Sequence, residues 1–199
     1  MKKTELTLIL LAVIALIMKL MYLPGSLILI VLSLSSVSLF YFYLGFAFFN
    51  GIGFKKILKK ESYKVISTQR IIGGIGTGFA LSISAIGILF KIQSYPGASI
   101  QLLVGLFGLG IVLIFSLIKM RKSTNNYYSK ILKRVASFGA ICVFFIAIPS
   151  KTWLNLNYPN NPEYVQAILE AEANPDDQES QDKVKEESEK IYGKFKKRR

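Results

Sequence analysis

Long apolar runs separated by short basic segments constrain this sequence more than any other feature. Apolar residues fill runs such as 26–49 and 98–118 almost continuously, instead of recurring at the spacing of an amphipathic helix or strand. Such runs are typical of transmembrane helices, because about 20 apolar residues in a helix cross the hydrocarbon core of a bilayer. A mean hydropathy of +0.43 is too high for an ordinary soluble domain. We therefore expect an all-α integral membrane protein.

The runs predict about five spans, at residues 6–18, 26–49, 71–90, 98–118 and 135–150. The first run also resembles a secretory signal peptide, but no small-x-small cleavage site follows it, so we expect an uncleaved span. The fifth covers only roughly 24 Å of a core of about 30 Å, and Trp153 just beyond it suits an interfacial anchor. We expect a transmembrane domain at 1–151 and a soluble helical tail at 152–199.

The charges follow this division. Of the 12 acidic residues only Glu5 and Glu61 lie before residue 160, whereas 17 of the 25 Lys and Arg lie at or before Lys151. The basic residues cluster at 55–70 and 119–134, which the positive-inside rule places in the cytoplasm together with the N-terminus. Five spans then put the tail outside, in the periplasm; a fifth span that only dips into the membrane would return it to the cytoplasm. Basic residues between spans favour contact with the bilayer over nucleic acid.

The tail is expected to form two helices. Asn161-Pro162-Glu163 and Asn174-Pro175-Asp176 each offer an N-cap, a Pro at the first helical position and an acid in the first turn. A narrow apolar stripe on the first helix is expected to pack on the second helix or on the membrane domain, and a partner is the other possible occupant. This stripe consists of Tyr164, Val165, Ile168 and Leu169.

An internal repeat is the most informative motif. The stretch 18–26 (MKLMYLPGS) aligns with 90–98 (FKIQSYPGA) 72 residues later, and each copy ends one apolar run and begins the next. The alignment pairs Lys19 with Lys91, Pro24 with Pro96 and Gly25 with Gly97. We expect two helical hairpins, repeat 1 at about 5–60 and repeat 2 at about 71–134, related by an axis along the membrane normal. Pro-Gly suits such a turn, because Pro leaves no N–H unpaired and Gly relaxes the backbone.

Two further sets of residues are candidates for helix contacts. Lys19 and Lys91 lie about one helical turn inside the outer membrane boundary, where each can snorkel to headgroups or donate to turn carbonyls. The alternative is a role in a transport pathway, but neither apolar run supplies an acidic partner. Gly74 and Gly78 form a small-xxx-small face that Gly105 and Gly108 could receive, within the chain or in a dimer. The aromatic cluster at 40–49 is expected to form a lipid-facing belt.

The second copy of the motif resembles the transmembrane hairpin of the gliding-motility and type IX secretion motor subunit L family (GldL/PorL), which carries Phe-Lys-x4-Pro-Gly-Ala between two spans. Phe90, Lys91, Pro96, Gly97 and Ala98 match it, and the first copy matches at Lys19, Pro24, Gly25 and Ser26. The resemblance implies a hairpin architecture and a bacterial inner membrane. That family places a carboxylate in its second span, whereas runs 26–49 and 98–118 contain no acid. A proton-driven motor role is therefore not expected.

The residue types also limit the chemistry. The chain has no His and a single Cys, Cys142, which excludes Ser–His–Asp and Cys–His catalysis, internal disulfides and the usual zinc sites. We expect no catalytic, cofactor-binding or metal-binding residues and no enzyme activity. The leading hypothesis is an inner-membrane subunit or scaffold that packs with a membrane partner or with itself, linked through the resemblance to gliding motility or type IX secretion. A small transporter or channel component built from the two hairpins is the alternative.

Overall fold

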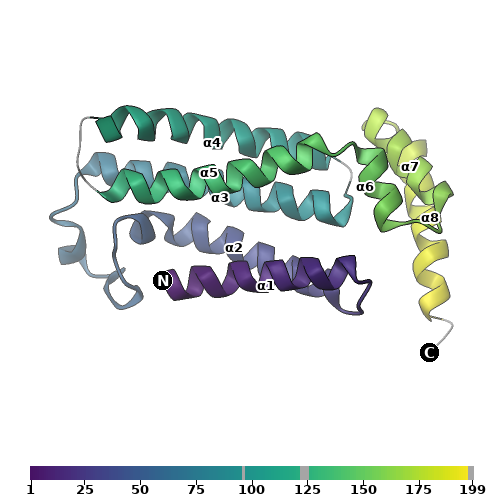
Figure 1. The fold of residues 1–199 in the computed structure, drawn as a ribbon, viewed down its shortest axis with the longest axis horizontal. Coiled ribbons are helices and arrows are strands. Elements are labelled where there is room, and N and C mark those ends of the chain that lie inside the picture. Colours follow the sequence, from purple (N-terminus) through teal and green to yellow (C-terminus); the bar gives the residue numbers. More distant parts are fainter. Residues whose placement is uncertain (96, 122–125, 197–199) are drawn as a thin grey trace.

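Within the described residues, five long helices lie side by side in a bundle, and three further helices gather at one end of it (Figure 1). The computed structural model describes residues 1–95, 97–121 and 126–196, and within them it contains helices, turns and loops but no strand. The bundle helices are α1 (Lys2–Leu20), α2 (Ser26–Phe49), α3 (Thr68–Gln93), α4 (Ala98–Arg121) and α5 (Asn126–Ala147). The helices of the tail are α6 (Ser150–Asn157), α7 (Pro162–Ala173) and α8 (Gln178–Lys196), and two single 3-10 turns, η1 (Phe54–Lys56) and η2 (Lys60–Tyr63), connect α2 to α3.

Helix α3 forms the centre of the bundle. It packs against α2, α4 and α5, while α1 packs on α2 and α4 packs on α5. In their most apolar stretches α3 is 56% buried and α4 only 22% buried. The outer helices therefore turn large apolar side chains such as Phe107 and Phe115 outward, and the surface of the bundle has the apolar character of a lipid-facing wall.

The predicted all-helical class is confirmed, and three of the predicted five spans have the length and apolar composition of membrane spans. Helices α2, α3 and α4 are long and apolar enough to cross a membrane, and α5 with α6, which meet at 87°, would add a fourth as a broken span. Helix α1 lies alongside α2, but its 19 residues include Lys2, Lys3, Glu5 and Lys19, more charge than a lipid-exposed span ordinarily holds. Five spans stay a prediction.

The ends of the bundle differ in the way that the charge pattern predicts. The N-terminus, the α2–α3 connection and the start of α5 lie at one end, whereas the α1–α2 and α3–α4 turns lie at the other end together with α6, α7 and α8 (Figure 1). The basic segments thus share an end with the N-terminus, and the tail extends from the opposite end. Which end faces the cytoplasm stays a prediction from the positive-inside rule.

Two boundaries near the fifth run differ from expectation. The segment 119–134 is not a loop: α4 continues to Arg121 and α5 begins at Asn126, so its basic side chains are mostly carried on helix ends. The run 135–150 is not one helix either, because α5 ends at Ala147 and the chain turns at Pro149 into α6. Pro disfavours helical geometry in the residue before it and has no N–H to continue the helix, which accounts for the break.

The start of the last helix also differs. Asn174-Pro175-Asp176 forms a turn, in which the Asp177 N–H donates to the Asn174 carbonyl at 3.1 Å, and α8 begins at Gln178. Asp177 supplies the cap: its carboxylate accepts from the Ser180 N–H at 3.1 Å and from the Ser180 hydroxyl at 2.5 Å. A carboxylate at this position satisfies a free N–H and complements the helix dipole, so the cap lies three residues later than predicted.

The tail has a small apolar core of its own. Leu154 of α6 and Val165 and Ile168 of α7 are buried together, with Val184 of α8 packed against them. The predicted stripe on the first tail helix therefore packs between α6 and α8. Because α6 continues directly from α5, this core joins the tail to the end of the bundle.

Candidate functional site: a buried ion pair and two lysine contacts

The two hairpin turns have the same backbone geometry 72 residues apart. Tyr22 and Ser94 both have positive φ, at 55° and 60°, and Gly25 and Gly97 have φ of 82° and 78°. The hydrogen bonds also correspond: the residue before each Pro-Gly unit closes the preceding helix, with the Leu23 N–H donating to the Met18 carbonyl at 2.9 Å.

In the second turn the matching bond runs from the Tyr95 N–H to the Phe90 carbonyl, also at 2.9 Å. No atom lies within 4 Å of the position that a Cβ would take on Gly25 or Gly97. The left-handed φ, rather than lack of space, therefore explains glycine at these two positions. Pro24 lies in the first turn, and Pro96 lies outside the described residues.

The two motif lysines point into the structure and each contacts the following unit of the chain. The Lys19 ammonium donates to the Ile92 carbonyl at the end of α3. Lys91, whose residue is only 3% exposed, donates to the Ser150 hydroxyl at the start of α6, at 3.2 Å. Both contacts satisfy helix-end or turn oxygens, the chemistry expected of a packing role. They tie α1 to α3 and α3 to α6.

The glycine contacts lie on a different helix pair from the one expected. Gly74 and Gly78 of α3 face α2, where a Cβ on Gly78 would clash with the Tyr41 carbonyl oxygen and lie 3.2 Å from the Gly45 Cα. The face that receives them is therefore on α2, and the expectation that Gly105 and Gly108 receive them is wrong. A helix can pack closely on two sides when small residues occupy both, and α3 does so.

The opposite face of α3 receives the two glycines of α4. A Cβ on Gly105 would lie 2.9 Å from the Ser84 Cα, and one on Gly108 would lie 3.4 Å from the Ala80 Cβ. All four predicted glycines are thus used in close helix packing within the chain.

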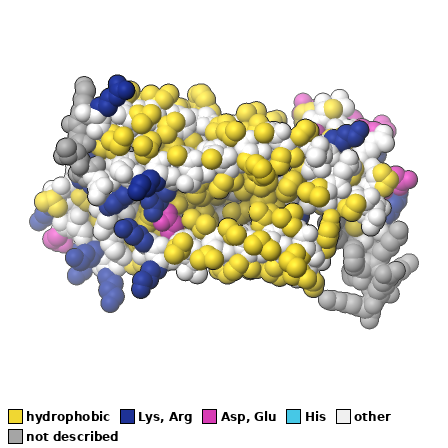
Figure 2. Space-filling view, viewed as in Figure 1, with side chains coloured by type: hydrophobic (Ala, Val, Ile, Leu, Met, Phe, Trp, Pro, Cys, Tyr) yellow, Lys and Arg dark blue, Asp and Glu magenta, His cyan; other side chains and the backbone are white. Residues whose placement is uncertain are grey.

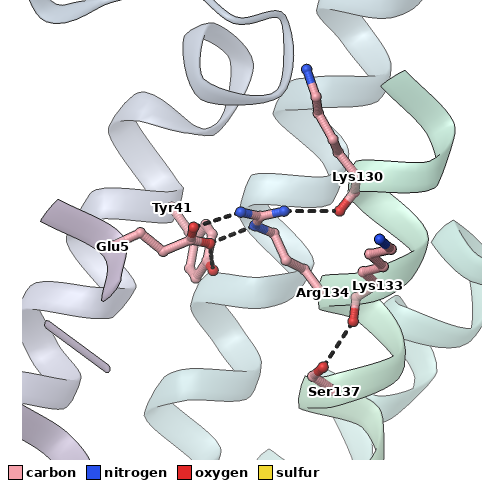
Figure 3. Close-up of polar contacts among 6 residues, drawn as sticks. All are labelled: Glu5, Tyr41, Lys130, Lys133, Arg134 and Ser137. Carbon is pink, nitrogen blue, oxygen red and sulfur yellow. Dashed lines mark hydrogen bonds and ion pairs between the residues drawn. The ribbon is translucent and has the colours of Figure 1, made fainter. Parts of the chain in front are cut away.

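A buried ion pair that sequence reasoning missed joins three helices at the N-terminal end of the bundle (Figure 3). The Glu5 carboxylate of α1 accepts from the Arg134 guanidinium of α5 through both oxygens, at 2.5 Å from Nε and 2.6 Å from Nη2. The Tyr41 hydroxyl of α2 donates to the same carboxylate at 2.5 Å. Glu5 is 8% exposed and Tyr41 fully buried. The predicted lipid-facing belt is therefore wrong for Tyr41, and also for Phe40, Phe48 and Phe49, which are buried as well; Phe42 and Tyr43 are exposed.

The surroundings of the pair explain its stability in a low-dielectric setting. A bidentate Arg–carboxylate contact matches the guanidinium fork to both carboxylate oxygens, and Tyr41 occupies a further lone pair. The Arg134 guanidinium also lies 4.6 Å from the centre of the Phe48 ring, a cation–π distance, and its Nη1 donates to the Lys130 carbonyl at 3.1 Å. Glu5 stands in the first turn of α1, where the helix dipole favours a negative charge.

Glu5, Tyr41 and Arg134 connect α1, α2 and α5 through polar contacts, and we call this cluster the clasp. Both Glu5 oxygens accept hydrogen bonds from side chains of other helices. Within the described ranges, no group of three or more His, Cys, Asp and Glu side chains could hold a metal ion. The sequence held a signal for one member of the pair only: Glu5 lies directly before the first apolar run, where a carboxylate needs a cation at the same membrane depth.

Comparisons with known proteins add no family to these observations. A scan against protein-family models, a search of the curated proteins and a search of the solved structures each found no match to this chain.

Proposed function

We propose that this chain is a non-enzymatic membrane scaffold subunit, in which a bundle whose buried charges are paired between its own helices presents a charged helical tail to a membrane-protein partner. One observation carries the proposal: the charged groups inside the bundle are used in contacts between helices. Glu5 pairs with Arg134, Lys19 donates to Ile92, and Lys91 donates to Ser150. A transport pathway ordinarily needs ionisable groups that face water or a substrate, whereas groups paired in this way stabilise one arrangement of helices.

The tail supplies the surface for a partner. Exposed acids and lysines alternate along α8 and form pairs one turn apart, such as Lys183 with Glu179 at 3.1 Å and Lys190 with Glu186 at 3.1 Å. Such exposed pairs contribute little to stability, so their value for the protein lies in solubility and in selecting a partner of complementary charge. The inner-membrane setting and the link to gliding motility or type IX secretion rest on the hairpin resemblance alone.

The experiment purifies the protein from its native membrane in a gentle detergent and measures the mass and composition of what is recovered. The test variant is the double charge reversal Glu186→Lys with Glu189→Lys on α8. The matched control is Glu61→Lys in the α2–α3 connection, at the other end of the bundle. We expect a defined complex, with a partner or a second copy, that the α8 variant loses and the control keeps. A lone monomer in every gentle detergent would contradict the proposal.

The matching turn geometry 72 residues apart favours one alternative, a small transporter component that uses two parallel hairpins. A flux assay separates the two functions, because a scaffold carries nothing by itself. Uptake of an ion or a small solute by the purified protein in liposomes would establish the alternative and overturn the scaffold.

A further inference from the structure

A pocket of about 210 Å³ opens beside the Glu5–Arg134 pair at the N-terminal end of the bundle. Besides Met1, Gly51 and Gly53, its lining combines three cationic side chains with three large apolar ones. These are Lys2, Lys130 and Arg134 together with Phe48, Phe49 and Ile52. The pocket thus joins α1, the end of α2 and the first half of α5, the same helices that the ion pair connects.

The pocket carries an excess of positive charge. Arg134 is neutralised by Glu5, but within the part of the chain that the structure describes neither Lys2 nor Lys130 belongs to an ion pair. The Lys130 backbone carbonyl accepts from Arg134, while its ammonium points away from the pair (Figure 3). Figure 2 shows dark blue side chains gathered around a magenta carboxylate at this end of the molecule.

The position of the pocket adds a second condition on its ligand. The basic end adjoins the apolar outer surface of the bundle (Figure 2), so the pocket lies where a lipid headgroup would meet the protein. A free phosphate would gain nothing from Phe48, Phe49 and Ile52, whereas a phospholipid places its glycerol and first methylene groups beside such a lining. The volume is below the usual range for a whole drug-sized ligand and fits a headgroup whose chains stay in the bilayer.

We propose that this pocket binds the headgroup of an anionic phospholipid, with Lys2 and Lys130 as the donors to its phosphate and the apolar lining beside its glycerol. The bound lipid would neutralise the two lysines that the Glu5–Arg134 pair leaves unpaired. It would also bridge α1 and α5 on the side that faces the membrane surface.

The test compares lipid binding by full-length variants in matched detergent. The pocket variant is Lys2→Gln with Lys130→Gln. The control is Lys3→Gln with Lys133→Gln, which removes the same charge from neighbouring positions that do not line the pocket. Native mass spectrometry titrates phosphatidylglycerol and phosphatidylcholine into each protein. Circular dichroism during heating verifies that both variants fold.

We expect the unmodified protein to retain phosphatidylglycerol in preference to phosphatidylcholine, and the pocket variant to bind phosphatidylglycerol about thirtyfold more weakly, from about fivefold per lysine near a charged surface. The control should stay within about twofold of the unmodified protein. Equal losses in the two variants would mean diffuse attraction and would overturn the pocket. If inorganic phosphate bound as tightly as the lipid and displaced it, the ligand would be a soluble anion, and the lipid assignment would be overturned.

Discussion

Removing Arg134 from the buried pair gives the sharpest test of the clasp. In Arg134→Met the methionine keeps the contact with the Phe48 ring, but Glu5 loses two of its three donors and keeps only the Tyr41 hydroxyl. An unpaired buried carboxylate typically costs about 3–5 kcal/mol. The Arg134 side chain is 21% exposed, so water reaches part of the site, and we expect the lower end of that range, about 3 kcal/mol.

A double-mutant cycle separates the pair from simple loss of packing. Glu5→Met alone leaves the guanidinium without its partner and should cost a similar amount. The double variant Glu5→Met with Arg134→Met leaves no buried charge and should lie within about 1 kcal/mol of the unmodified protein, because apolar replacements of a buried pair are often close to neutral. The free energy of unfolding is measured in mixed micelles of a mild detergent and sodium dodecyl sulfate, by circular dichroism.

The control for this cycle is Lys133→Met, which removes a cation from an exposed position one residue before Arg134 and should change stability by less than about 0.5 kcal/mol. Additive costs in the double variant would refute the reasoning, because they would show that Glu5 and Arg134 do not depend on each other. A cost below about 1 kcal/mol for Arg134→Met would refute it as well.

Three further predictions concern helix packing, the tail and the topology. Gly78→Ala places a methyl group against the backbone of α2 and should lower the free energy of unfolding by about 1–3 kcal/mol. The control Gly76→Ala, whose new Cβ has no atom within 4 Å, should be neutral or stabilising. Unfolding in mixed micelles compares the two variants, and equal effects would contradict the close contact. The Ser180 hydroxyl and N–H lower the pKa of the Asp177 carboxyl, so the cap of α8 is complete above the ordinary Asp pKa and is lost as the pH falls through the lowered value. Amide exchange in the first turn of α8 should rise in that acidic window, and Asp177→Asn, which caps without titrating, should weaken this pH dependence; an unchanged profile would be inconsistent with this cap. In intact cells with a permeable outer membrane, a membrane-impermeant thiol reagent should label Glu189→Cys but label Glu61→Cys only after lysis, and the reverse pattern would place the tail in the cytoplasm.

Local patterns in the sequence were sufficient for the features that depend on neighbouring residues. Continuous apolar runs predicted α2, α3 and α4, and Pro-Gly predicted turns in which Gly25 and Gly97 take a left-handed φ. The conformation of such a turn is decided within a few residues, and the length of an apolar run is a local property as well.

The features that sequence reasoning missed depend on distant residues. Glu5 and Arg134 are 129 positions apart, and nothing in either segment indicates the other as its partner. Gly74 and Gly78 show that α3 has a flat face, but the choice between α2 and α4 as its neighbour depends on how the bundle closes. The cap of α8 was misplaced because two good N-cap residues, Asn174 and Asp177, lie three positions apart, and the local pattern alone does not choose between them.

The distance along the chain between Glu5 and Arg134 affects when the two residues can meet during synthesis. At about 5–20 residues per second, the ribosome synthesises Arg134 roughly 6–26 s after Glu5. Throughout that interval the α1 carboxylate lacks the guanidinium that later accompanies it into the bundle. Because α1 is synthesised first but receives its counter-ion last, late docking is favoured: α1 can rest at the membrane surface until α5 emerges. Completion of α5 would then allow α1 to dock, so that only a chain translated beyond α5 acquires the final packing of the bundle.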